Sequence, residues 1–203
     1  MDANFWNNRY NEEGFAYGNS PNAWFESNIS YLKPNSKLLF PAEGEGRNAV
    51  FAAQQGFECC AFDVSAAGKE KALLWAKELD VQLDYQVGAL EELEFELDSF
   101  DGIVLSYAHL PYPDRIVFHK KLLSLLKIDG IVIFEAFAKE QLDYQSGGPK
   151  VETMLFSLEE VMEEFEGLQF TIIQHAIVKL EEGKYHQGEG AVIRFVGQKL
   201  RNY

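Results

Sequence analysis

The residues with the clearest chemical pattern are the stretch 43–49, Glu-Gly-Glu-Gly-Arg-Asn-Ala. Gly44 and Gly46 allow a sharp turn and a close approach of the backbone to a ligand. The free N–H groups at the start of the helix that follows would point at the same place. The bare pattern also occurs by chance in loops, but its position after an apolar strand favours a ligand-binding turn.

Asp63 supports this interpretation, because it lies at the tip of a second expected strand at 58–62. In a doubly wound sheet this tip lies beside the glycine turn, where a carboxylate can accept both hydroxyls of a ribose. The competing interpretation is an aspartate that caps a helix just before Ser65, which is itself a plausible N-cap.

Strand and helix patterns alternate around these residues, which predicts a mostly parallel sheet with helices on both faces. Ser157 begins a capping box for a further helix that runs to about residue 165. The expected strands are 37–41, 58–62, 81–86, 101–106 and 131–134, and the expected helices are 47–55, 66–79 and 114–127.

The C-terminal part differs, because two long apolar strands at 169–180 and 191–199 are joined by only ten residues. Strands joined so closely must be antiparallel. We therefore expect one α/β domain over residues 1–203, doubly wound and Rossmann-like. Its mostly parallel seven-stranded sheet would end in an antiparallel hairpin. Residues 1–36 are aromatic and loop-like and are expected to form a cap on the core at 37–203.

The composition excludes some partners. Eighteen basic residues stand against 32 acidic ones, and the net charge of −14 repels phosphate backbones and anionic membranes. No apolar run reaches the ~18 residues needed to span a bilayer, and the N-terminus resembles no secretory signal, so we expect a cytoplasmic protein.

Cys59 and Cys60 are adjacent and are expected to be core residues without a disulfide or metal. The acidic runs within 91–96 and 159–164 are expected to be solvated.

Glycines and a ribose-binding acid do not distinguish a dinucleotide from an adenosyl group. An antiparallel hairpin that closes a parallel sheet, with an aromatic N-terminal extension, is typical of class I methyltransferases. The chain resembles those related to the tellurite-resistance and thiopurine methyltransferases. The matching stretches are 5–10 with 17–21, 44–49, 62–65, 106–111, 140–141 with 146–149, and 185–188.

This resemblance implies S-adenosylmethionine as the cofactor and methyl transfer to a small-molecule nucleophile, with thiol or metalloid-like acceptors favoured. The backbone at 43–46 would meet the methionine part of the cofactor, Asp63 its ribose and Val64 its adenine. Ser106 would lie near the sulfonium. The full implied cofactor set is Tyr17, Gly18, Glu43, Gly44, Glu45, Gly46, Arg47, Asn48, Asp63, Val64, Ser65, Ala89, Leu90 and Ser106.

The sequence departs from the family pattern at two positions. Many relatives carry an acid where this chain has Phe40, and many carry aspartate where it has Ala89. Both departures predict weaker anchoring of the cofactor by side chains.

Methyl transfer requires the nucleophile, methyl and sulfur to be held in line, and an aromatic-lined pocket with few charges suits the loss of charge on sulfur. Candidate walls are Trp6, Tyr10, Tyr107, Phe137 and Tyr144.

His109, just past the fourth strand, is the candidate general base or substrate contact. A structural histidine bonded to the backbone is the alternative. Arg9 would steer an anionic substrate or the cofactor carboxylate, or form a surface ion pair. Glu135 would contact substrate or face water. His186 is expected to be exposed in the hairpin loop.

Two other functions compete with methyl transfer. An NAD-type oxidoreductase would need a second nucleotide-binding half, which the sequence lacks. A catalytically silent cofactor-binding module would fit the substitutions at Phe40 and Ala89. The sequence does not indicate the oligomeric state.

Overall fold

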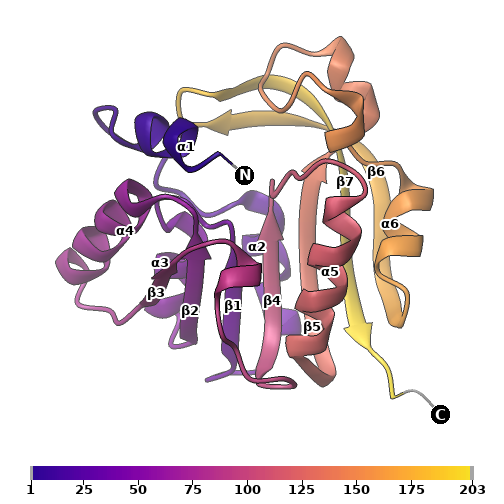
Figure 1. Cartoon of the computed structure of the whole chain (residues 1–203), viewed down its shortest axis with the longest axis horizontal. Helices are drawn as coiled ribbons and strands as arrows, with labels where there is room; N and C mark the ends of the chain where they lie inside the picture. Colours follow the sequence, from indigo (N-terminus) through magenta and orange to yellow (C-terminus); the bar gives the residue numbers. More distant parts are fainter. Residues whose placement is uncertain (1, 202–203) are drawn as a thin grey trace.

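The computed structural model describes residues 2–201, and all of its strands belong to one seven-stranded sheet (Figure 1). The strand order is β3-β2-β1-β4-β5-β7-β6. The strands are β1 (Lys37–Pro41), β2 (Glu58–Asp63), β3 (Asp84–Val87), β4 (Phe100–Ser106), β5 (Leu126–Phe137), β6 (Leu168–Glu182) and β7 (His186–Lys199).

The first five strands pair in parallel, whereas β7 is antiparallel to both of its neighbours. The predicted α/β fold with a C-terminal antiparallel hairpin is confirmed. No helix of the described residues is long and apolar enough to cross a membrane.

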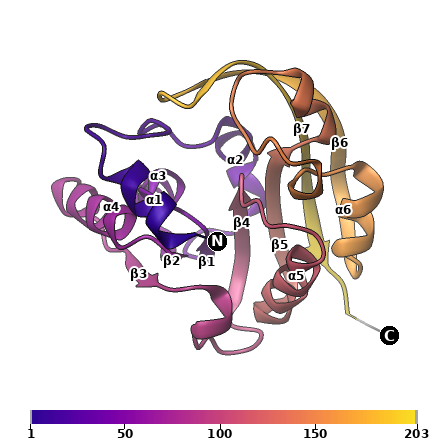
Figure 2. The same cartoon turned by 45° about the horizontal axis from the view of Figure 1, so that its top comes forward.

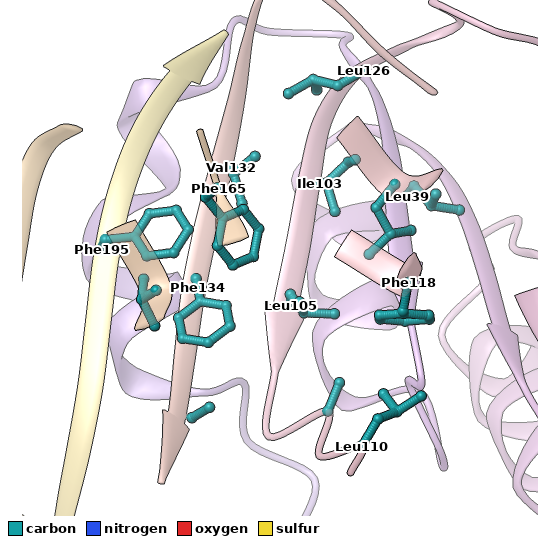
Figure 3. Close-up of a cluster of buried hydrophobic side chains, with 14 of the residues drawn as sticks. Leu39, Ile103, Leu105, Leu110, Phe118, Leu126, Val132, Phe134, Phe165 and Phe195 are labelled. Carbon is teal, nitrogen blue, oxygen red and sulfur yellow. The ribbon is translucent and has the colours of Figure 1, made fainter. Parts of the chain in front are cut away.

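Helices cover both faces of this sheet. The α-helices are α1 (Ala3–Tyr10), α2 (Ala23–Asn28), α3 (Arg47–Gln54), α4 (Ala66–Glu78), α5 (Asp114–Leu125) and α6 (Leu158–Glu164). The 3-10 helices are Ile29–Tyr31, Leu90–Glu92, Lys139–Asp143 and Glu152–Met154. One core cluster joins α2, α3 and α4 to the sheet around Phe40, and another joins α5 and α6 around Phe134. Figure 3 shows Phe134, Phe165 and Phe195 packed in the second cluster.

The unit β1-α3-β2 follows its sequence pattern closely. β1 is buried along almost its whole length and pairs with β2 from Lys37 to Pro41. Gly46 is the N-cap of α3 with a φ of 87°, a conformation that favours glycine. Ser65 caps α4 by accepting from the Gly68 N–H at 3.1 Å. Cys59 and Cys60 are buried, as predicted.

Several predicted boundaries were wrong. β3 begins at Asp84, three residues later than expected, and β5 begins at Leu126, directly after α5. The residues expected to form a ten-residue hairpin loop instead extend both strands, whose pairing reaches Glu182 and His186. Their charged and glycine-rich composition suits strand ends that project beyond the sheet core, where alternate positions face solvent.

The N-terminal segment is more regular than expected. Asp2 caps α1 because its Oδ1 accepts from the Asn4 N–H at 2.9 Å and the Phe5 N–H at 3.3 Å. The helix lies above α4 at the end of the sheet that also carries the hairpin tip (Figures 1 and 2).

Candidate functional site

A cavity of about 570 Å³ opens at the carboxyl ends of β1, β2, β4 and β5. Its walls come from α1, the glycine turn, the β4–α5 loop, the segment after β5 and the hairpin tip. The lining residues are Asp2, Phe5, Trp6, Arg9, Tyr10, Tyr17, Ala42, Glu43, Arg47, Asn48, Asp63, Ser106, Tyr107, Ala108, His109, Phe137, Gly147, Gly148, Pro149, Lys150, Val151, Met154, Tyr185 and His186.

Asp63 lies directly beside the glycine turn, as predicted. Its Oδ2 accepts from the Gly44 N–H at 3.1 Å, and its Oδ1 accepts from the Ser65 N–H at 2.9 Å. Each carboxylate oxygen retains a further acceptor site. Burial raises the pKa of Asp63 to about 6 despite the backbone N–H groups that it accepts from.

The two glycines serve different purposes from those expected. A Cβ at Gly44 would overlap the hydroxyl of Tyr10, which α1 places on the turn. A Cβ at Gly46 would lie 2.6 Å from the Ala72 Cβ, so this glycine allows α3 and α4 to pack closely. Neither glycine lines the cavity. The close approach at this turn is between protein groups.

Glu43 faces the cavity from the same turn. Its Oε1 accepts from the N–H groups of Asn48 and Ala49, at 2.7 and 2.8 Å, at the start of α3. Burial raises the pKa of Glu43 to about 7, and these hydrogen bonds offset only part of the effect. Phe40, at the position where many relatives carry an acid, is fully buried in the apolar core. The acidic side chain that this turn presents to the cavity is therefore Glu43.

The other side chains of the turn bond mainly within the protein. Glu45 accepts from the Ala16 N–H at 2.7 Å and pairs with Lys71 at 2.8 Å, away from the cavity. Asn48 Oδ1 accepts from the Asn22 N–H at 2.8 Å. These contacts tie the turn to the N-terminal segment.

Four further residues of the implied cofactor set do not line the cavity, namely Val64, Ser65, Ala89 and Leu90. Leu90 belongs to the apolar core. Ser65 donates through its Oγ to the Asn7 Oδ1 of α1 at 2.8 Å. α1 therefore bonds to the start of α4, where the adenine was expected.

Tyr17 and Arg9 meet at the mouth of the cavity, while Gly18 lies outside the lining. Arg9 Nη1 donates to the Tyr17 hydroxyl at 3.1 Å, and its guanidinium lies 3.6 Å from the centre of the Tyr185 ring. No carboxylate of the described residues lies within ion-pair distance of Arg9. Its remaining N–H groups are available to an anion.

The opposite wall is aromatic. Tyr107 follows Ser106 at the end of β4 with a φ of 53°, which is uncommon for a bulky residue and marks a position worth functional attention. Its ring lies 4.7 Å from those of both Phe137 and His186. Trp6 stacks on Tyr10 with ring centres 5.4 Å apart.

Glu135 and Tyr144 lie outside the cavity. Glu135 Oε1 accepts from the Tyr107 hydroxyl at 2.9 Å and from Asn22 Nδ2 at 2.7 Å. Burial raises its pKa despite these hydrogen bonds. Glu135 thus supports the Tyr107 wall from behind, while Tyr144 packs against the main core.

His109 lines the cavity, but both of its ring nitrogens meet backbone groups. Nδ1 lies 2.8 Å from the Met154 carbonyl, to which it donates, and Nε2 accepts from the Phe137 N–H at 3.4 Å. Burial lowers its pKa to about 4. This environment matches the structural alternative foreseen for His109 and leaves little freedom for proton transfer.

His186 was expected to be exposed, but it is 5% exposed and lines the cavity. Nδ1 lies 3.0 Å from Glu182 Oε2, and Nε2 has no hydrogen-bond partner among residues 2–201. Burial lowers the pKa of His186, so the ring is neutral near pH 7. The prediction failed because β6 and β7 pair further than expected, which brings the ring over the sheet end.

Arg47 belongs to the same group of buried side chains as His186 and Glu182. Its guanidinium bonds the Glu182 carboxylate through both Nη atoms, each at 3.1 Å. Although burial alone would raise the pKa of Glu182, the contacts with His186 and Arg47 lower it to about 2. The ionised carboxylate fixes the Nδ1–H tautomer of His186 and leaves the Nε2 lone pair as a proton acceptor.

Comparisons with known proteins agree with this architecture. Residues 41–130 match the family model of a methyltransferase domain. No curated protein matches the chain.

Solved structures with the same fold share little sequence with the chain. One of them comes from work on the conversion of a disulfide bond into a thioacetal group during echinomycin biosynthesis, and it is 13% identical to this chain. It aligns over 100% of this chain and 91% of its own, with a TM-score of 0.79. A SAM-dependent methyltransferase from Methanosarcina mazei is 14% identical over 86% and 97%, with a TM-score of 0.72. TehB from Haemophilus influenzae is 13% identical over 97% and 66%, with a TM-score of 0.73.

Residues 41–130 are thus similar to a methyltransferase domain. The seven-stranded fold with its closing hairpin is shared with solved SAM-dependent methyltransferases.

Proposed function

We propose that the cavity binds S-adenosylmethionine along the glycine turn and places the methyl group toward Tyr107, Phe137 and His186. The observation that carries this proposal is the 3.1 Å hydrogen bond between the Gly44 N–H and Asp63 Oδ2 at the cavity wall. It supports a ribose site, because both Asp63 oxygens keep acceptor capacity beside the turn.

The cofactor residues proposed from the sequence divide into two groups. Tyr17, Glu43, Asp63 and Ser106 line the cavity and suit direct contact. Gly44 and Gly46 shape the turn, and Gly18, Glu45 and Ser65 hold the surrounding segments. Arg47 and Asn48 line the cavity but are paired within the protein. Val64, Ala89 and Leu90 would require a local shift to meet the adenine.

The residues present fit this cofactor. When bound, it supplies a methyl group activated by a positively charged sulfur. The rings of Tyr107 and Phe137 can attract such a cation, and Glu43 offers a carboxylate close by. Arg9 offers unpaired N–H groups to the carboxylate of the cofactor or to an anionic acceptor.

We further propose a small-molecule acceptor, with a thiol or a metalloid-like species favoured, and kinship with the tellurite-resistance and thiopurine methyltransferases. The uncharged walls around Tyr107 and Phe137 support a soft nucleophile. The relative described by thioacetal formation from a disulfide also acts on sulfur, which favours a sulfur acceptor here.

His186 is proposed as the general base, in place of His109. Its Nε2 would accept the proton of the acceptor S–H as sulfur forms the new bond to carbon. The bound cofactor would supply the methyl group and retain the electron pair, and His186 would hold the proton. Glu182 and Arg47 hold the imidazole in the required tautomer. His109, Trp6, Tyr10 and Phe137 would contact the acceptor as walls, with Glu135 and Tyr144 acting from behind.

The alternatives receive less support. An NAD-type oxidoreductase would use a second mononucleotide half, whereas this sheet ends in the β6–β7 hairpin. A silent module would not need the Glu182–His186 pair. We propose that residues 1–203 form one domain in which 1–36 cap the core. We expect it in the cytoplasm, without nucleic-acid or membrane partners.

Calorimetric titration with S-adenosylmethionine, S-adenosylhomocysteine and NAD tests the cofactor site. Binding of both adenosyl ligands without NAD is expected. Methylation assays with a panel of thiols, selenite and tellurite then test the acceptor class. Turnover with none of them, in a protein that binds the cofactor, would contradict the proposed acceptor.

A further inference from the structure

Arg115 of α5 is a buried charge that does not line the cavity. It is 1% exposed, its Nε donates to Glu164 Oε1 at 2.7 Å, and its Nη2 lies 2.9 Å from Glu160 Oε2. His119 Nδ1 lies 2.8 Å from the other Glu164 oxygen. Glu164 is 4% exposed, so the prediction that its acidic run is solvated was wrong for this residue. Burying such ions is costly and is weak evidence for a purely stabilising role.

The network ends on the backbone of the segment before α6. Arg115 Nη1 donates to the Leu155 carbonyl at 2.6 Å. His109 Nδ1 donates to the Met154 carbonyl, and the Tyr112 N–H donates to the Thr153 carbonyl at 3.0 Å. Three consecutive carbonyls, 153 to 155, are therefore held by residues 109–115.

Both of the joined segments carry cavity walls. Residues 107–109 line one side, and residues 147–151 with Met154 line another. The second segment contains only one short 3-10 helix, Glu152–Met154. Its backbone groups need partners, and His109 and Arg115 supply two of them at the Met154 and Leu155 carbonyls.

We infer that Arg115, held by Glu164, which His119 also contacts, is a positioning residue that fixes the acceptor wall at 147–154 against the β4–α5 loop. The inference rests on the proposed assignment of this half of the cavity to the acceptor. A planar guanidinium can donate to a carbonyl and a carboxylate at once while it forms an ion pair with a second carboxylate, which a lysine ammonium cannot match in geometry. A wall misplaced by about 1 Å can cost on the order of 100-fold in rate.

Hydrogen exchange in the full chain tests this inference without an acceptor. The amides of Met154 and Leu155 donate to the Val151 and Glu152 carbonyls, at 3.0 and 2.9 Å, and report opening of the wall. Arg115→Lys should speed exchange at these two amides about tenfold. Exchange in β1 and β2, and the Kd for S-adenosylhomocysteine, should stay at the wild-type values. With thiophenol as the acceptor, KM should rise more than kcat falls.

Lys139→Met is the matched control, because Lys139 pairs with the same Glu160 at 2.6 Å through a side chain that bonds no carbonyl of 153–155. It should leave exchange at both amides unchanged. Glu164→Gln is the second variant if Arg115→Lys does not fold, and it should accelerate the same amides.

Wild-type exchange at Met154 and Leu155 in the folded variants, or equal acceleration throughout the chain, would overturn the inference. Failure of the wild-type protein to methylate thiols would instead count against the proposed acceptor. The two proposals can therefore fail separately.

Discussion

The glycine-turn half of the cavity and its acceptor half differ in how their residues come together. Glu43 and Gly44 lie in the turn after β1, Asp63 ends the adjacent strand β2, and one hydrogen bond joins the turn to the strand tip. His186 instead reaches Tyr107 from the far end of the chain, and it is linked to Arg47 through Glu182. Local motifs thus build the first half, whereas strand pairing near the C-terminus builds the second.

The largest expected effect is a loss of turnover from a change in the acceptor half alone. His186→Gln should lower kcat with a thiol acceptor by about 10²- to 10⁴-fold, because the proton acceptor is lost. The Kd for S-adenosylhomocysteine should change little. Steady-state kinetics and calorimetry measure both quantities, and His109→Gln provides the comparison, with a smaller loss of kcat. A His186 variant with normal kcat across the pH range would remove it from the reaction.

Gly46→Val should damage the scaffold of the cofactor half. The new side chain would meet Ala72 of α4 and require a positive φ, so we expect a loss of about 2–4 kcal/mol in the free energy of unfolding. Chemical denaturation measures this loss. Gly14→Val, at another positive φ with open space around it, should cost less. Equal stability of the two variants would show that α3–α4 packing does not select this glycine.

Asp63→Ala should weaken binding of S-adenosylmethionine by about 1–3 kcal/mol, since charged hydrogen bonds to the ribose would be lost. Calorimetric titration gives the change in Kd. Asp84→Ala, at the start of β3 and outside the cavity lining, is the control and should bind normally. An unchanged Kd for the Asp63 variant would leave Asp63 as a residue that only orders the turn.

The smallest effect is a pH dependence in the cofactor half. The pKa of Glu43 is raised to about 7, so its carboxyl becomes neutral as the pH falls below this value. A cationic ligand favours the ionised form, so the affinity for S-adenosylmethionine should rise with pH through 7, by at most about tenfold per pH unit. Titrations between pH 5.5 and 8.5 measure it. A Glu43→Gln variant that kept the same slope would assign the effect to another group.

The sequence predicted what depends on local pattern. The strand–turn–helix unit around Gly44, the Ser65 cap and the hairpin were found because their spacing and capping chemistry are short-range. Three features were missed because each depends on how distant segments pack. They are the contact of Tyr10 with Gly44, the hydrogen bond from Tyr107 to Glu135, and the burial of His186. Glu164 was misleading, since burial beside Arg115 reverses the exposure expected of its acidic run.

The most direct test of the central claim is a crystal structure with S-adenosylhomocysteine. We predict that the ribose hydroxyls bond the Asp63 carboxylate and that the sulfur lies between the glycine turn and the Tyr107 wall. A ligand bound with its ribose away from Asp63, or outside this cavity, would contradict it.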